Sequence, residues 1–118
     1  MENKRVVGKK KEELAEKYLR QLGYEILEKN FYSYAGEVDI IAKDGVYLVF
    51  VEVKYRKTLR QGYAAEAVTK EKQRRIYRAS AYYLYKKGLP ADTTPCRFDV
   101  VSIQGEQIRL IKNAFGGF

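Results

Sequence analysis

The chain has 118 residues, of which 23 are lysine or arginine and 15 are aspartate or glutamate, so its net charge is +8. This length predicts a single domain, 1–118. The chain has no histidine and one cysteine, Cys96, which excludes Ser-His-Asp triads, internal disulfides and zinc sites built from histidine or cysteine. Any metal chemistry must therefore use oxygen ligands, which favours Mg²⁺ or Mn²⁺.

Charge and hydropathy also restrict location and partners. No apolar run approaches the roughly 20 residues of a membrane span, and the charged amino terminus lacks a signal segment. Together with the cysteine usage, this predicts a cytoplasmic protein that contacts no membrane. The positive charge favours a phosphate-rich partner such as nucleic acid, although simple solubility accounts for it equally well.

The elements were assigned from apolar spacing and from turn and capping residues. Apolar residues at helical spacing define the first helix, Asp44-Gly45 indicates a tight hairpin, and Thr69 and Gly88 mark the ends of the second helix. This order predicts an α/β fold, a mixed sheet flanked by helices. In chain order we expect a flexible lead-in (1–8), a helix (9–22), strands (24–31, 36–42 and 46–55), a helix (69–87), strands (97–103 and 107–111) and a flexible tail (114–118).

The strand predicted at 46–55 carries an unusual charged pair. It is apolar on both faces until Glu52, which predicts a central strand covered on both sides. Lys54 points to the same face as Glu52 because strand side chains alternate. Taken alone, a Glu-x-Lys sequence in a strand is usually an exposed charge pair.

The hairpin adds further carboxylates to this face. If Asp44-Gly45 is the two-residue loop, Glu37 lies opposite Glu52, and Asp39 lies diagonal to Glu52 at roughly 7–8 Å between backbones. Carboxylates this close resist ionisation, and a divalent cation that prefers oxygen ligands relieves the repulsion. The alternative is that Glu37 and Asp39 form the polar face of an edge ribbon.

Each predicted helix offers one polar residue near its apolar face. Glu12 lies about 90° from the centre of that face on the first helix, whereas Glu13 points away. Gln73 falls within the apolar stripe of the second helix, where a buried amide needs partners. Glu12 could instead belong to a solvated surface, and Gln73 could be a satisfied core amide.

These residues closely resemble a known family. The YraN-type proteins are small bacterial proteins grouped as endonucleases of the PD-(D/E)xK superfamily, near the archaeal Holliday-junction resolvases. The resemblance runs from about Gly8 to Phe115. The matching segments are 12–19, 36–42, 48–54, 66–68, 72–73, 97–101 and 113–115.

The resemblance implies a restriction-endonuclease-like core and a catalytic set. Asp39 corresponds to the first acid of the superfamily motif, and Glu52 and Lys54 to its (D/E)xK element. Glu12 and Gln73 occupy positions where related proteins have helix-borne polar residues. The resemblance implies that Asp39, Glu52 and Glu12 hold Mg²⁺ or Mn²⁺. Glu37 is a possible extra acid that the superfamily motif does not require. We expect the DNA backbone to be held by Lys10, Lys11, Arg56, Lys57, Arg60, Lys72, Arg74 and Arg75.

The expected function is therefore hydrolysis of phosphodiester bonds in DNA, with branched or structured DNA as the substrate and RNA left open. The competing hypothesis is a module on a nuclease fold that binds nucleic acid without cutting it. A homodimer is expected by analogy with resolvases, because cutting two symmetric strands needs two sites. Among the tyrosines, Tyr77 and Tyr83 are expected in the core, and Tyr32, Tyr34 and Tyr63 are candidates for base stacking or partner contact.

Overall fold

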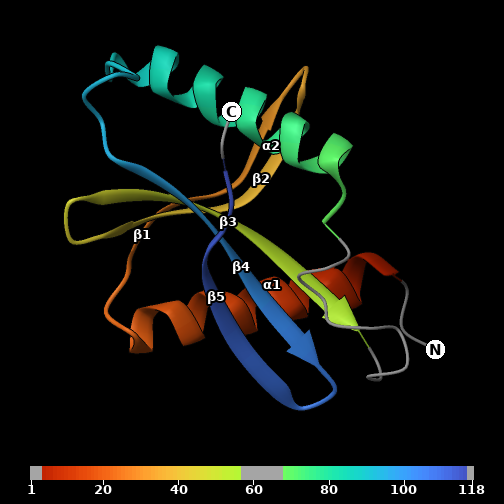
Figure 1. The fold of residues 1–118 in the computed structure, drawn as a ribbon. Coiled ribbons are helices and arrows are strands. Elements are labelled where there is room, and N and C mark those ends of the chain that lie inside the picture. Colours follow the sequence, from red (N-terminus) through yellow and green to blue (C-terminus); the bar gives the residue numbers. More distant parts are fainter. Residues whose placement is uncertain (1–3, 57–67, 117–118) are drawn as a thin grey trace.

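A computed structural model describes residues 4–56 and 68–116 and has a five-stranded sheet between two helices (Figure 1). The sheet order is β1-β2-β3-β4-β5. Only β3 and β4 are parallel, because α2 connects them, and the other neighbours are antiparallel. The α/β class and the mixed sheet are confirmed. The elements are α1 (Lys4–Gln21), β1 (Glu25–Ser33), β2 (Gly36–Asp44), β3 (Tyr47–Arg56), α2 (Lys70–Lys87), β4 (Cys96–Gln104) and β5 (Gln107–Phe115).

The core has one layer on each face of the sheet. On the α2 side, Phe50 packs with Ile76 and Tyr83. On the α1 side, Leu19 packs with Val49 and with further strand residues. The central strand β3 is buried on both faces up to Glu52, as its continuous apolar run predicts.

Helix α2 has the predicted start and end. The Thr69 hydroxyl accepts a 3.1 Å hydrogen bond from the backbone N–H of Lys72, and Gly88 ends the helix in a left-handed conformation with φ 68°. The prediction that Tyr77 lies in the core is wrong, because 41% of its surface is exposed. The stripe that faces the sheet instead includes Ala79.

The register of the hairpin between β2 and β3 differs from the predicted register by two residues. Asp44 pairs with Tyr47, so the loop is Gly45-Val46 and not Asp44-Gly45. Gly45 has φ 60°, and a glycine at the first loop position is typical of a type II′ turn. The expected pairing of Glu37 with Glu52 is therefore wrong. A shift of two residues leaves every side chain on its predicted face.

Two element ends also differ from prediction. Helix α1 begins at Lys4 rather than Lys9, including part of the lead-in expected to be flexible, because a single glycine such as Gly8 costs a helix only about 1 kcal/mol. Strand β5 continues to Phe115, whose ring stacks on Phe98 at 5.3 Å between centroids. No helix in the described ranges combines the length and apolar composition needed to cross a bilayer.

Candidate metal centre

The candidate site lies where β2 and β3 separate. Their pairing runs from the hairpin to Ile40 and Val51, whereas β3 continues beside β4 to Arg56. One step beyond the last pair, Asp39 lies beside Glu52. The backbone N–H of Val53 donates a 2.8 Å hydrogen bond to Asp39 Oδ2. A side chain thus satisfies the β3 backbone at the end of its pairing with β2.

Both carboxyl groups of this pair are withdrawn from water. Asp39 is 8% exposed and Glu52 is 4% exposed. Burial and the charge of Glu52 raise the pKa of Asp39 to about 8. Burial also raises the pKa of Glu52, although two lysines and a hydrogen bond with Asp39 oppose the shift. Near neutral pH the pair therefore retains a proton that exposed carboxyl groups would release.

One oxygen of the pair has no partner. Glu52 Oε2 is the one buried side-chain polar atom in the described part of the chain that makes no hydrogen bond. A buried carboxylate oxygen without a donor is costly. Two adjacent carboxyl groups with an open oxygen are a donor set suited to a hard divalent cation.

Two ammonium groups flank the other oxygen of Glu52. Lys54 Nζ lies 3.8 Å from Oε1, as expected from the Glu-x-Lys spacing. Lys72 Nζ lies 3.7 Å from the same atom. Lys72 was predicted on the DNA-binding surface. The capped first turn of α2 instead brings it over β3, a placement that sequence reasoning missed because it depends on how the helix docks.

Glu12 and Glu37 lie near the pair without joining it. Burial and the charge of Glu37 raise the pKa of Glu12, and Asn30 opposes the shift. The charges of Glu37, Glu12 and Asp39 together raise the pKa of Tyr32, which pairs with Glu37 across β1 and β2. However, no three acidic or cysteine side chains in the described residues are arranged to hold a metal ion. The three-carboxylate cluster expected from the sequence is therefore reduced to a pair.

Gln73 has a structural partner. Its Nε2 donates a 3.0 Å hydrogen bond to the carbonyl of Val68, just before α2. The amide nitrogen is therefore satisfied, as in the structural alternative. The same bond fixes the segment that enters the helix.

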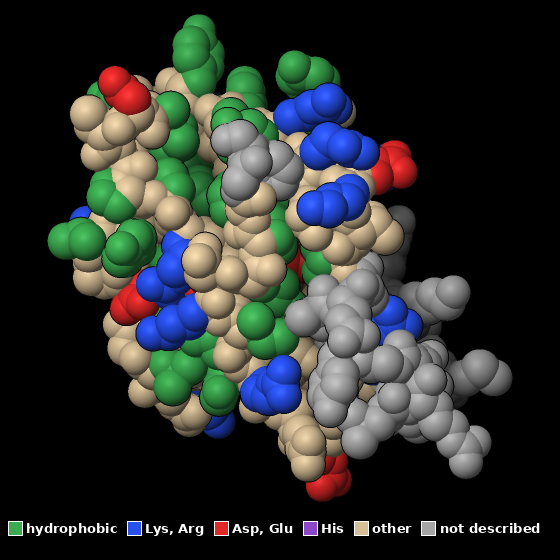
Figure 2. Space-filling view, viewed as in Figure 1, with side chains coloured by type: hydrophobic (Ala, Val, Ile, Leu, Met, Phe, Trp, Pro, Cys, Tyr) green, Lys and Arg blue, Asp and Glu red, His purple; other side chains and the backbone are tan. Residues whose placement is uncertain are grey.

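The expected DNA-binding residues fall in several places. Figure 2 shows lysine and arginine side chains gathered over the region where α2 begins. Arg74 and Arg75 are exposed there, and Arg75 forms an ion pair of 2.6 Å with Glu71. Lys11 lies 4.5 Å from the centre of the Tyr55 ring. Lys10 is exposed and Arg56 is half-buried, whereas Lys57 and Arg60 lie outside the described residues.

Comparison with known proteins gives the family. The model of "Uncharacterised protein family UPF0102" matches residues 11–103. The chain belongs to the UPF0102 family. A UPF0102 protein of Lachnoclostridium phytofermentans is 52% identical over 116 residues, covering 98% of both chains. One from Caldicellulosiruptor saccharolyticus is 47% identical over 119 residues, covering 96% of this chain and 99% of its own. One from Aliivibrio salmonicida is 46% identical over 114 residues, covering 95% and 93%.

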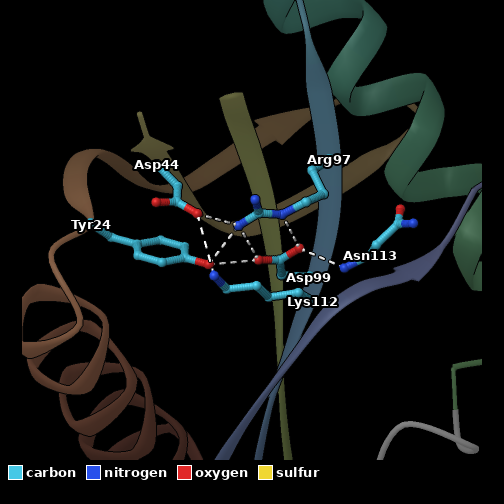
Figure 3. Close-up of polar contacts among 6 residues, drawn as sticks. All are labelled: Tyr24, Asp44, Arg97, Asp99, Lys112 and Asn113. Carbon is cyan, nitrogen blue, oxygen red and sulfur yellow. Dashed lines mark hydrogen bonds and ion pairs between the residues drawn. The ribbon is translucent and has the colours of Figure 1, made fainter. Parts of the chain in front are cut away.

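This UPF0102 chain has a second buried polar cluster that sequence reasoning did not identify. Figure 3 shows Asp99 held between Tyr24 and Arg97. The fully buried Asp99 carboxylate accepts hydrogen bonds from Tyr24 Oη at 3.0 Å, from Arg97 Nε at 2.9 Å and from the backbone N–H of Asn113 at 3.0 Å. Arg97 also pairs with Asp44 at 2.8 Å.

The second cluster is internally compensated, unlike the first. Burial, together with the charge of Asp99, raises the pKa of Tyr24, and hydrogen bonding to Asp99 raises the pKa of Arg97. Tyr24 and Arg97 therefore keep their usual protonation at neutral pH. The available signal was an aspartate within the apolar run Phe98–Val101. The arrangement is that of a structural cluster, which ties the hairpin end of β2 to β4 and β5.

Proposed function

We propose that this UPF0102 protein is a metal-dependent endonuclease that hydrolyses phosphodiester bonds in branched or otherwise structured DNA. The observation that carries the proposal is the buried pair of Asp39 and Glu52, with an unsatisfied oxygen at Glu52 Oε2 and two lysines beside it. A purely structural site would satisfy that oxygen, as the cluster around Asp99 does.

The donor set supports Mg²⁺ or Mn²⁺ as the cofactor. Asp39 and Glu52 would hold the cation, and Glu12 is near enough for its charge to act on Asp39. Both ions prefer carboxylate oxygens, and the chain has no histidine to favour other transition metals. When bound, such a cation supplies Lewis acidity, which lowers the pKa of water and offsets the charge of the phosphate.

The protein's own groups would position and stabilise the reacting phosphate. The Val53 N–H holds Asp39 in place. Lys54 is partly exposed while it contacts Glu52, so its ammonium group can turn toward a phosphate and stabilise charge that grows in the transition state. Lys72 offers a second ammonium group from α2. Gln73 contributes by fixing the start of that helix.

The basic surface would bind the flanking DNA. Phosphate contacts from Lys10, Lys11, Arg56, Arg74 and Arg75, with Lys57 and Arg60 outside the described residues, give affinity that depends on salt and little on sequence. Selection by shape, as for branches, follows from such contacts, and RNA of similar shape is a competing substrate. Cleavage of two symmetric strands would require a homodimer.

Cleavage of plasmid and of synthetic branched DNA with Mg²⁺ or Mn²⁺ tests the proposal. Asp39→Asn, Glu52→Gln and Lys54→Ala should each lower the rate by at least about 100-fold while circular dichroism shows an intact fold. Lys43→Ala, which removes an exposed charge at the hairpin end of β2, is the matched control and should cut normally. The site is wrong if all three variants cut as fast as wild type.

One observation favours the non-catalytic alternative. No third acid in the described residues joins the pair closely enough to hold a metal, and the two lysines already offset part of the charge of Glu52. A binding module would show salt-dependent DNA affinity that survives Glu52→Gln and no metal-stimulated cleavage of any substrate.

A further inference from the structure

A groove rich in tyrosine runs between α2 and the turn that joins β1 to β2. It has a volume of about 350 Å³. Tyr34 is 98% exposed and Tyr85 is 82% exposed. The lining residues are Tyr34, Ala35, Tyr77, Arg78, Ala81, Tyr82 and Tyr85. Four aromatic rings and one cation therefore meet on a surface that contains no acidic residue.

The two walls of this groove are held in close contact. Gly36 has φ 154°, and a Cβ added there would lie 3.2 Å from the Cβ of Arg75. The backbone at the start of β2, directly after the turn, thus packs against α2. Tyr34 stands at one side, and the rings of Tyr82 and Tyr85 stand at the other.

The groove is built on the same two elements that flank the candidate metal centre, α2 and the start of β2. Along α2, Arg78 lies six residues after Lys72, about 9 Å along the helix axis. Along the other wall, the strand that follows Tyr34 leads directly to Asp39. Figure 2 shows apolar and basic side chains together along the edge formed by α2.

Exposed rings beside arginine suit one kind of ligand. Unpaired bases stack on tyrosine rings whatever their sequence, and arginine contacts the phosphates between them. Paired bases inside a duplex do not offer their faces in this way. Apolar contact alone would also suit a protein partner. The lack of acidic residues in the lining and the net charge of +8 favour a polyanion.

We infer that this groove binds a single-stranded nucleic-acid arm and directs it toward Asp39 and Glu52. The inference rests on the proposed function and narrows its substrate class to structured DNA that carries an unpaired arm, such as a flap or fork. The bases stack on Tyr34, Tyr82 and Tyr85, and Arg78 contacts the backbone.

Fluorescence anisotropy in EDTA, where no metal-dependent cleavage can occur, tests this inference. The probes are a blunt duplex and the same duplex with an oligothymidine extension.

Wild type should bind the extended duplex more tightly. Tyr34→Ala and Tyr85→Ala should each weaken binding of the extended duplex about 10-fold, whereas Tyr34→Phe and Tyr85→Phe, which keep the ring, should bind it like wild type. Arg78→Ala should reduce the slope of the logarithm of the binding constant against the logarithm of the salt concentration by about one. Lys43→Ala is the control for loss of a positive charge.

The outcomes separate this inference from the proposed function. Loss of preference for the extended duplex in the alanine variants, with the phenylalanine variants normal, supports the groove even if wild type cleaves nothing. Equal binding of both probes by wild type overturns the groove and leaves cleavage of branched duplexes untouched. If the alanine variants keep their affinity but change from dimer to monomer in sedimentation, the groove is a contact between two copies of the chain and the inference is wrong.

Discussion

The Asp39 carboxylate accepts the backbone N–H of Val53 at 2.8 Å, and Glu52 lies between Val53 and the last residue of β3 that pairs with β2. One side chain therefore ends the pairing of two strands and faces a second buried carboxylate. The structural role needs an acceptor, which asparagine also supplies. The proposed chemical role needs a negative charge, which asparagine lacks. This difference allows the two roles to be tested separately.

The metal-free protein should lose stability as pH rises. The folded pKa of Asp39 is about 8, above that of an unfolded aspartate, so the folded state binds an extra proton between about pH 4 and 8. The stability from that proton is present below pH 4 and is lost as pH rises through 8. Denaturant unfolding in EDTA should show the free energy of unfolding of Asp39→Asn gaining on the order of 4 kcal/mol relative to that of wild type between pH 5 and pH 8. If the free energies of unfolding of Asp39→Asn and wild type differ by the same amount at every pH, the shifted pKa of the buried pair is contradicted.

A divalent cation should reverse this loss. Mn²⁺ at 100 times its dissociation constant stabilises a single-site protein by about 2.7 kcal/mol, so the melting temperature of wild type should rise by several degrees. Glu52→Gln should abolish the rise. Glu13→Gln, which changes an exposed acid on α1, should retain it, and Glu12→Gln should reduce it if Glu12 assists binding. An equal rise in Glu52→Gln and wild type would place the cation elsewhere.

Lys72 should affect catalysis although it lies outside the Glu-x-Lys element. Its Nζ is 3.7 Å from Glu52 Oε1 and lowers the pKa of that carboxyl. Lys72→Ala should slow cleavage about 10- to 100-fold and shift the rising limb of the pH–rate profile to higher pH. Lys70→Ala removes an exposed lysine from the same first turn of α2 and serves as the control. Equal rates for the two variants would remove Lys72 from the site.

The cluster around Asp99 should matter for stability and leave metal binding intact. Asp99→Ala removes the buried partner of Arg97, which should lower the free energy of unfolding by about 3–5 kcal/mol. Tyr24→Phe deletes two hydrogen bonds, the one that the hydroxyl donates to Asp99 and the one that it accepts from Arg97 Nη2, and should cost about 1–3 kcal/mol. Urea unfolding measures both losses. If Tyr24→Phe, which remains folded, binds Mn²⁺ much more weakly than wild type, the cluster is part of the metal centre after all.

The sequence predicted well those features that depend on local chemistry. Thr69 and Gly88 mark the bounds of α2 because capping involves only neighbouring residues. Asp39 and Glu52 fall on one face because strand periodicity survives a shift of two residues. The shift itself was missed because Asp44 or Gly45 could each begin the loop, and the positive φ of Gly45 settles it.

Features that depend on packing between distant elements could not be predicted. Lys72 reaches Glu52 only when α2 docks over β3. Asp99 contacts a residue just before β1 and another near the far end of β5, and its partner Arg97 contacts the end of β2. Tyr77 was assigned to the core from helical spacing, but the turn between β1 and β2 leaves it at the groove.

The central claim is that Asp39 and Glu52 together hold a divalent cation. Anomalous diffraction from crystals soaked in Mn²⁺, at a concentration that supports cleavage in solution, tests it most directly. The account predicts one strong peak within about 2.0–2.3 Å of oxygens from both carboxylates, and no peak there in Asp39→Asn crystals. A peak at any other group of residues, or none in the wild type, would contradict it.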